Sequence, residues 1–290
     1  MRKIEPSELI INEDGSIFHL HVKPSQIATT VILVGDPNRV DMVAAHFDSK
    51  ECEVSSREFH TITGMYHGKR ISCVSHGIGC DNIDIVVTEL DALVNIDFET
   101  REVKKDHTTL TLVRIGTSGG LQTVSPVGSF VASCRSLGFD GMLNFYDLGE
   151  GVVDTDFENA FMKHVQWNPR LTTPYAVKAS QKLIDKIAFD MVPGVTISAS
   201  GFYGPQGRYV RAKLADPELN AKIETFRYGK ELITNYEMES SALAGLSRLL
   251  GHEGLTVCLI IAGRVAKNMN TNYKNNINDL VQIVLDRVTE

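Results

Sequence analysis

The 290-residue chain lacks the cysteine pattern of a disulfide-stabilised or zinc-binding protein and the long apolar runs of a membrane protein. Its five cysteines are odd in number and scattered, and no Cys-x-x-Cys pair occurs, so neither a disulfide framework nor a zinc site is expected. No apolar run approaches the ~20 residues that a membrane-spanning helix needs. The first residues also lack the apolar core of a signal peptide. We therefore expect a cytoplasmic protein that does not engage a membrane.

An excess of positive charge is also missing from the chain. The formal net charge is −7, which argues against a nucleic-acid binder because such a protein shows a basic face. Hydrophobic residues make up 43% and charged residues 22%, proportions that are ordinary for a globular enzyme. His19 and His21 share one face of an extended segment, but no third ligand accompanies them, so we expect no metal site.

The chain has no repeats, low-complexity tracts or Pro/Gly/Ser-rich linkers, so residues 1–290 are interpreted as a single domain. Strand-like and helical patterns alternate along it. The predicted strands are 29–34, 69–75, 109–115, 195–199 and 255–262, and the predicted helices are 36–47, 82–94, 237–250 and 277–287. This alternation predicts an α/β fold with a central mixed sheet. Residues 137–156 are rich in Gly and Asp and are predicted to form a surface excursion.

A glycine turn joins a strand to a helix at residues 31–39 (VILVGDPNR). Asp36 and Pro37 supply a helix N-cap and a first-turn proline. Backbone N–H groups at Gly35 and at the helix start favour an anion, and Arg39 reinforces that preference. The segment is not a Walker loop, and taken alone it also fits a tight connection with a surface arginine.

A second arginine lies inside an apolar strand at residues 112–120 (LVRIGTSGG). A buried guanidinium needs a partner, and the planar fork of Arg114 matches phosphate oxygens. We expect a small-residue loop with Thr117 to follow the strand, at the carboxyl edge where α/β sheets collect ligands. These features favour an anion site over a flexible turn.

Residues 198–208 (SASGFYGPQGR) place an aromatic pair shortly before Gln206 and Arg208. An aromatic ring such as that of Phe202 can stack on a flat heterocycle. A glutamine amide offers a donor and an acceptor together, whereas arginine offers donors only. Uracil presents an N3–H donor flanked by two carbonyl acceptors, so these side chains suit it. The loop could equally be a structural turn with a packed aromatic.

Two carboxylates bracket a methionine where a helix is predicted to begin, at residues 235–242 (NYEMESSA). A carboxylate only accepts hydrogen bonds, which suits the paired hydroxyls of a ribose. Acids in a first helical turn also favour the helix dipole, so Glu237 and Glu239 could have different roles. Met238, an adaptable apolar side chain, could line the face of the sugar.

Taken together and in this order, these motifs resemble those of the nucleoside phosphorylase-I family, and within it the uridine phosphorylases. The motifs are GDPxR, SREF (56–59), HGIG (76–79), RIGTSGG, FYxxQxR and EMES, spread over roughly residues 17–265. The resemblance implies a three-layer α/β/α fold with a central mixed, partly barrel-like β-sheet. It also implies reversible phosphorolysis of uridine to uracil and ribose 1-phosphate, in pyrimidine salvage and nucleoside catabolism. Inorganic phosphate is then a co-substrate, and no cofactor is required.

The resemblance also assigns roles to individual residues. The implied phosphate site consists of Gly35, Arg39, Arg114, Thr117 and, from a neighbouring subunit, Arg57. The implied ribose site consists of Met238, Glu239 and, reaching across a homodimer, His19. The implied base pocket consists of Phe202, Gln206, Arg208 and Arg264. Of these, the residues expected to carry catalysis are Arg114, Glu239, Gln206 and Arg208.

Three features bear on the subclass and the assembly. Purine-specific relatives place an aspartate after the last strand, whereas residues 260–264 (IIAGR) contain no acid. In the same segment, Gly263 departs from the asparagine that the resemblance predicts before Arg264. Some relatives bind a monovalent cation between subunits; Glu58 and the backbone of Ile78 match that site, and Asn82 replaces its serine. The enlarged middle segment leaves a homodimer and a hexamer both open.

Four alternatives remain beside the main interpretation. Two are a purine nucleoside phosphorylase and a broader pyrimidine nucleoside phosphorylase. A third is a hydrolase that uses water in place of phosphate, which Arg39 and Arg114 argue against. The fourth is a nucleoside-binding sensor without turnover.

Overall fold

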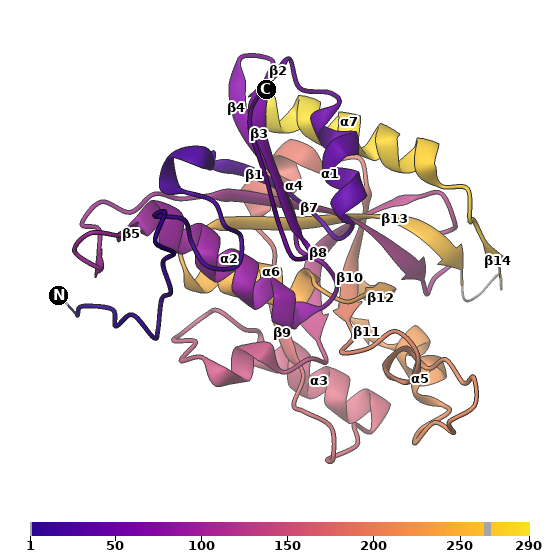
Figure 1. Cartoon of the computed structure of the whole chain (residues 1–290). Coiled ribbons are helices and arrows are strands. Elements are labelled where there is room, and N and C mark those ends of the chain that lie inside the picture. Colours follow the sequence, from indigo (N-terminus) through magenta and orange to yellow (C-terminus); the bar gives the residue numbers. More distant parts are fainter. Residues whose placement is uncertain (1, 264–267) are drawn as a thin grey trace.

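A mixed β-sheet runs through the middle of the molecule, and helices lie on both of its faces (Figure 1). The computed structural model describes residues 2–263 and 268–290. The strands of this sheet are β1 (Thr30–Val34), β2 (Ser49–Ser56), β3 (Phe59–Tyr66), β4 (Lys69–Ser75), β7 (Thr111–Gly120), β8 (Phe130–Gly138), β9 (Tyr175–Lys178), β10 (Val192–Ser198), β11 (Arg227–Tyr228), β12 (Glu231–Glu237), β13 (Glu253–Gly263) and β14 (Asn268–Met269). A separate two-stranded sheet contains β5 (Ile96–Asp97) and β6 (Glu102–Val103).

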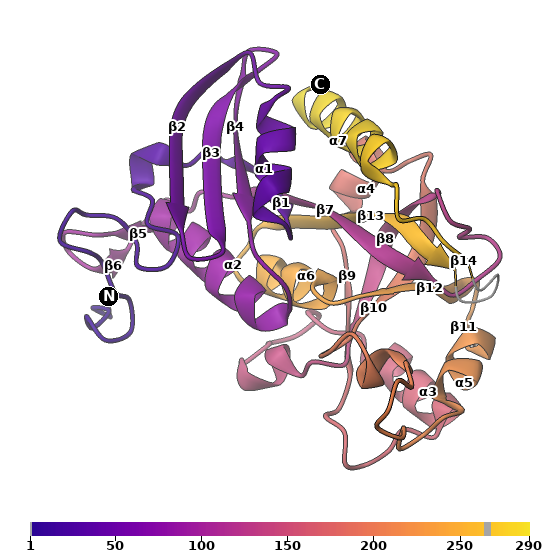
Figure 2. The ribbon, with the colours of Figure 1, turned by 45° about the vertical axis from the view of Figure 1, so that its right-hand side comes forward.

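Part of the large sheet closes on itself. Strands β7, β13, β8, β10 and β12 are neighbours in that order, and β12 then pairs with β7 through Asn235–Gly120 and Tyr236–Gly119. This ring of five strands forms a small barrel, from which β1, β4, β3 and β2 extend as an open sheet (Figure 2). The predicted α/β class with a mixed, partly barrel-like sheet is therefore confirmed.

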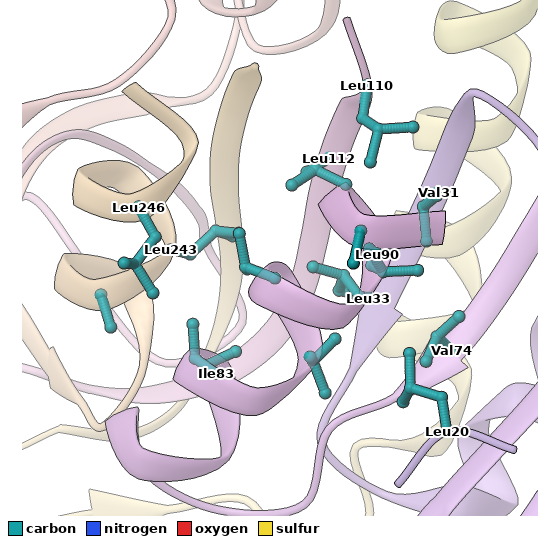
Figure 3. Close-up of a cluster of buried hydrophobic side chains, with 14 of the residues drawn as sticks. Leu20, Val31, Leu33, Val74, Ile83, Leu90, Leu110, Leu112, Leu243 and Leu246 are labelled. Carbon is teal, nitrogen blue, oxygen red and sulfur yellow. The ribbon is translucent and has the colours of Figure 1, made fainter. Parts of the chain in front are cut away.

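Alternate residues of β1 face two different layers of helices. Val31 and Leu33 belong to the same buried cluster as α2 (Cys80–Asn95) and α6 (Ser240–Leu249), as Figure 3 shows for side chains including Ile83 of α2. Ile32 and Val34 belong to the cluster formed with α1 (Pro37–Ala44), α4 (Gln181–Ile187) and α7 (Lys274–Thr289). A strand that is buried on both faces has a continuous apolar sequence. Burial of each such side chain stabilises the folded state by roughly 1.5–3 kcal/mol.

A third cluster lies beside the barrel and includes Leu137 and Phe139, so the start of the segment predicted to be a surface excursion is buried. It joins α3 (Thr155–Val165) and α5 (Leu219–Thr225) to the barrel through aromatic side chains such as Phe157, Phe161 and Phe226. None of the helices in the described part of the chain combines the length and apolar character needed to cross a membrane.

Two element boundaries near the predicted site differ from the prediction. The small-residue segment after Ile115 is not a loop, because β7 continues to Gly120 through its pairing with β13 and β12. The helix predicted from Glu237 begins at Ser240, because Glu237 still pairs with Ser198 of β10 as the last residue of β12. Both differences bring side chains of neighbouring strands to one edge of the sheet.

Candidate active site

A cavity of about 1200 Å³ opens where β1, β7, β10, β12 and β13 end. It lies at the carboxyl edge of the parallel strands, where ligands of α/β proteins bind. The predicted site residues that line it are Gly35, Arg39, Arg114, Thr117, Phe202, Gln206, Arg208, Met238 and Glu239. The four segments singled out in the sequence therefore meet at one place.

The turn after β1 forms one side of the cavity. Asp36 caps α1 by accepting a hydrogen bond from the N–H of Asn38 at 2.9 Å, as predicted. A Cβ atom on Gly35 would lie 3.3 Å from the carbonyl oxygen of Gly77, so the two loops approach closely only because residue 35 has no side chain. Arg39 reaches from α1 toward β7, where its Nη1 lies 3.4 Å from the carbonyl oxygen of Ile115.

Arg39 and Arg114 place two positive charges near each other at this end of the cavity. Burial lowers the pKa of Arg39, and the charge of Arg114 lowers it further. An anion bound between the two guanidinium groups would offset this unfavourable effect on Arg39. This end of the cavity is therefore suited to a small oxyanion.

Arg114 is buried and uses three of its nitrogens at once. Its Nε lies 3.1 Å from Nε2 of His76, its Nη1 lies 2.9 Å from Oε2 of Glu237, and its Nη2 contacts Glu239. Burial alone would lower the pKa of Arg114, but the carboxylates of Glu239 and Glu237 raise it above its ordinary value. The guanidinium is thus permanently charged and held from both sides.

The two acids around Met238 have different surroundings. Glu237 is fixed at the start of α6, where it accepts hydrogen bonds from the Ser198 hydroxyl at 2.6 Å and from the N–H groups of Glu239 and Ser240. Glu239 lines the cavity and accepts the N–H of Gly79 at 2.7 Å. Both acids line the cavity, but Glu237 also anchors the helix start through two backbone N–H groups, whereas Glu239 accepts one.

The pKa of Glu239 is raised from 4.5 to about 7. Burial is the main cause, and the neighbouring carboxylate of Glu237 adds to it, while the guanidinium of Arg114 opposes the shift. One guanidinium balances only one of two adjacent carboxylates, so the second takes up a proton more readily. A hydroxyl-rich ligand would meet an acid whose charge changes near neutral pH.

The loop after β10 supplies the other end of the cavity. Gln206 is buried, and its Oε1 accepts a hydrogen bond from Nη1 of Arg208 at 2.6 Å. The guanidinium of Arg208 stacks on Phe202, with Cζ 3.8 Å from the ring centroid. Asn220 of α5 donates to the backbone carbonyl of Gln206 at 3.1 Å and so ties this loop to the barrel. An aromatic face, an amide and a guanidinium therefore occur together.

Two predicted site residues, His19 and Arg57, do not line this cavity, and a third lies outside the described residues. His19 contacts Glu89, with Nδ1 2.6 Å from Oε1, and Arg57 is exposed, with its Cζ 5.7 Å from the ring centroid of Phe18. Phe18 therefore contacts both residues, and neither of them lines the cavity. Arg264 lies outside the described residues.

The sequence interpretation missed His76, which is fully buried and contacts Arg114 directly. The only indication of His76 in the sequence was its place in the HGIG motif (76–79). The residues discussed for a monovalent cation, Glu58, Ile78 and Asn82, all line the cavity, and the cation itself stays a prediction.

Two other clusters among the described residues bring three metal-ligating side chains within 4.8 Å of one another, but neither lies at the cavity. They are Asp91, His107 and His252, and Asp41, Glu53 and His60. Nδ1 of His252 already accepts the N–H of Leu110 at 3.1 Å, and its Nε2 lies 3.1 Å from Oδ1 of Asp91 without making a hydrogen bond. His60 faces Glu53 at 3.2 Å and the Pro37 carbonyl at 3.4 Å, so both its nitrogens already have protein acceptors.

Comparison with known proteins identifies the relatives of this site. A family model described as the phosphorylase superfamily matches residues 29–289. The uridine phosphorylase of Thermococcus kodakarensis is 27% identical over 271 residues, which cover 91% of this chain and 84% of the relative. A purine nucleoside phosphorylase of Vibrio vulnificus is 24% identical over 273 residues, covering 93% and 96%. A solved nucleoside phosphorylase of Trypanosoma brucei, described as showing uridine phosphorylase activity, superposes with a TM-score of 0.89 at 27% identity, covering 97% and 100%.

Proposed function

The chain belongs to the phosphorylase superfamily and is a nucleoside phosphorylase, and from this premise we propose that its nucleoside is uridine. The observation that carries the proposal is that Gln206 and Arg208 line the same cavity as Arg39 and Arg114. The first pair offers the donors and the acceptor that uracil needs, and the second pair offers the positive charge that phosphate needs.

The proposed reaction exchanges one bond at C1′ of the ribose for another. The C1′–N1 bond to uracil breaks, a phosphate oxygen bonds to C1′, and the departing base takes a proton at N1 from solvent. As the bond lengthens, the ribose gains positive charge and the base gains negative charge. Catalysis then comes from positioning and from charges that are in place before the reaction, with no covalent enzyme intermediate.

Each end of the cavity has a proposed task in this reaction. Arg39 and Arg114, with Gly35 and Thr117, hold phosphate against C1′, where its negative charge also stabilises the ribose cation. Glu239 accepts hydrogen bonds from the 2′- and 3′-hydroxyls beside Met238. Gln206 and Arg208 stabilise the uracil anion as it leaves, and Phe202 stacks on the base.

We also propose that the enzyme works as a homodimer, or a larger assembly of such dimers, with shared sites. His19 and Arg57 lie together on the surface of the chain and outside its own cavity. In the proposed dimer, Arg57 completes the phosphate site of the neighbouring subunit and His19 reaches its ribose 5′-hydroxyl.

A substrate panel tests the proposal directly. Uridine, thymidine, cytidine and inosine are each incubated with the enzyme, with and without phosphate, and free base and ribose 1-phosphate are measured. We expect uridine to be cleaved only when phosphate is present. Faster cleavage of inosine would identify a purine nucleoside phosphorylase, and uracil release without phosphate would identify a hydrolase. Binding of uridine with no product would leave the sensor interpretation.

A further inference from the structure

His76 lies directly behind the proposed phosphate site. It follows β4, its N–H donates to the carbonyl of Val34 at 2.8 Å, and its side chain has no exposed surface. Its Cε1 is 3.7 Å from where a Cβ on Gly35 would be, and its Nε2 is 3.1 Å from Nε of Arg114. The imidazole is therefore packed between the glycine turn and the arginine that both face the cavity.

The contact with Arg114 fixes the protonation of the imidazole. Arginine nitrogens only donate hydrogen bonds, so Nε2 of His76 must accept and the single ring proton must be on Nδ1. Burial lowers the pKa of His76 well below its ordinary value, and the charge of Arg114 lowers it further, so the ring stays neutral. Within the described part of the chain, Nδ1 has no hydrogen-bond partner.

The absence of a hydrogen bond at Nδ1 bears on why a histidine occupies this position. A buried donor without a partner destabilises the fold, and an apolar side chain of similar size would avoid the loss. The presence of an imidazole is therefore explained by its other nitrogen, Nε2, which accepts the hydrogen bond from Arg114. A carboxylate there would also accept this hydrogen bond, but it would neutralise the charge that attracts an oxyanion, and a neutral imidazole does not.

Arg114 has three contacts besides that with His76: its Nη1 lies 3.9 Å from Sγ of Cys258 in β13, and it forms ion pairs with two carboxylates. Glu237 and Glu239, from the end of β12 and the start of α6, attract the guanidinium toward the proposed ribose site. His76 is its hydrogen-bond partner on the β4 side. Without that contact, the two carboxylates would be the strongest remaining influence on the position of the guanidinium.

We infer that His76 is a positioning residue, whose neutral Nε2 holds Arg114 at the phosphate end of the cavity against the attraction of Glu237 and Glu239. The inference rests on the proposed function, because it takes Arg114 to be a phosphate ligand. It concerns the affinity for phosphate and leaves the nucleoside end of the cavity unaffected.

Steady-state kinetics of three variants test the inference. His76→Leu removes the acceptor while keeping an apolar side chain of similar bulk, and it should raise the KM for phosphate about tenfold or more, with the KM for uridine changed less than about threefold. His76→Gln can present an oxygen near the position of Nε2, so it should restore the KM for phosphate to within about threefold of wild type. If the leucine variant does not fold, His76→Asn, which stays polar but is too short to reach Arg114, takes its place with the same expected result.

His252→Leu is the matched control. His252 is also buried and also accepts an N–H through a ring nitrogen, from Leu110 at 3.1 Å, but it does not line the cavity. Its replacement should lower the melting temperature and leave the KM for phosphate unchanged. The inference is overturned if His76→Leu keeps the wild-type KM, if His252→Leu raises it equally, or if glutamine restores nothing. Failure of the proposed function is distinguishable, because the wild-type enzyme itself would then cleave inosine faster than uridine, release uracil without phosphate, or form no product.

Discussion

Arg114 and Glu237 form a buried ion pair, in which Nη1 lies 2.9 Å from Oε2. Glu237 is itself held by the Ser198 hydroxyl and by the N–H groups at the start of α6. A buried guanidinium is stable only with such partners, and removing one partner leaves the other charge uncompensated. The pair therefore orders the proposed phosphate site before any substrate arrives, which is the condition for electrostatic catalysis.

Replacing Arg114 with alanine should affect both activity and stability. Loss of a preorganised donor should reduce kcat by about 10²–10³-fold, which corresponds to about 2.7–4 kcal/mol. The free energy of unfolding should fall by about 3–5 kcal/mol, because Glu237 and Glu239 would remain buried without their cation. Kinetics at saturating phosphate and urea denaturation measure the two effects. Near-normal turnover of Arg114→Ala at saturating phosphate would contradict the assignment.

Glu239 should make the stability of the protein depend on pH near neutrality. Its pKa is raised from 4.5 to about 7, so between these values the folded state binds a proton that the unfolded state has released. The stabilisation is therefore fully present below about pH 4.5 and is lost as pH rises through about 7, a change of about 3 kcal/mol. Glu239→Gln does not titrate. We expect the unfolding free energy of wild type, relative to this variant, to fall over that pH range, and equal slopes for the two proteins would refute the assignment.

The segment around Gly35 could be predicted from sequence because its determinants are local. A β-branched run, a glycine, an N-cap aspartate and a first-turn proline follow one another within nine residues, and the structure has β1, the turn and α1 in that order. The helix predicted to reach Phe47 ends at Ala44, a difference typical of helix boundaries. Such patterns depend on neighbouring residues, and so a single sequence contains them.

The environment of Arg114 could be predicted only in part. Its position in an apolar strand showed that it needed a partner, but His76 is 38 residues away and Glu237 lies on a strand that is not its neighbour in sequence. Which strands close the barrel is decided by long-range pairing such as that of Tyr236 with Gly119, and no local pattern specifies it. For the same reason, the sequence did not indicate that Glu237, which lines the cavity together with Glu239, also anchors the start of the helix.

Mixing two inactive variants tests whether sites are shared between subunits. Arg57→Ala and Arg114→Ala should each be nearly inactive, because each removes a cation from every phosphate site. In a mixed dimer, one site combines the intact Arg114 of one subunit with the intact Arg57 of the other. Random mixing should therefore restore about a quarter of the wild-type activity, since half of the dimers are mixed and each has one intact site.

The mixed sample is prepared by refolding the two variants together, and each variant refolded alone is the control. Activity is then measured against the composition of the mixture. If no mixed assembly recovers activity, Arg57 does not act at a neighbouring site.

Replacing Gln206 with leucine should weaken the preference for uridine. Leucine has a similar size but neither donates nor accepts, so the N3–H and a carbonyl of uracil would lose their partner, and Arg208 would lose one of its acceptors. We expect kcat/KM for uridine to fall by about 10²-fold or more, because a site built to hydrogen-bond its substrate loses most when those bonds are missing. The KM for phosphate should change little. A variant that still cleaves uridine at the wild-type rate would exclude Gln206 from base recognition.

Adding a single methyl group at Gly116 should displace Arg114 without disturbing the barrel. A Cβ there would lie 2.6 Å from Nη1 and 2.9 Å from Cζ of Arg114, whereas no backbone atom is among its closest neighbours. The end of a long side chain can usually move aside, but this guanidinium is held by His76, Glu237 and Glu239, so moving it breaks contacts that the site depends on. Gly116→Ala should therefore lower kcat/KM for phosphate by about 10–10²-fold, since a misplacement of about 1 Å has effects of that size.

Gly119→Ala is the comparison on the same strand, because its new Cβ would meet only the carbonyl oxygen of Ala262, at 3.9 Å. That distance is an ordinary van der Waals contact, so the change in kcat/KM for phosphate should be clearly smaller than at Gly116. Both substitutions remove the same backbone freedom from the unfolded chain, so their difference isolates the contact with Arg114. Equal losses in the two variants would mean that the strand, and not the position of the guanidinium, determines how well phosphate is used.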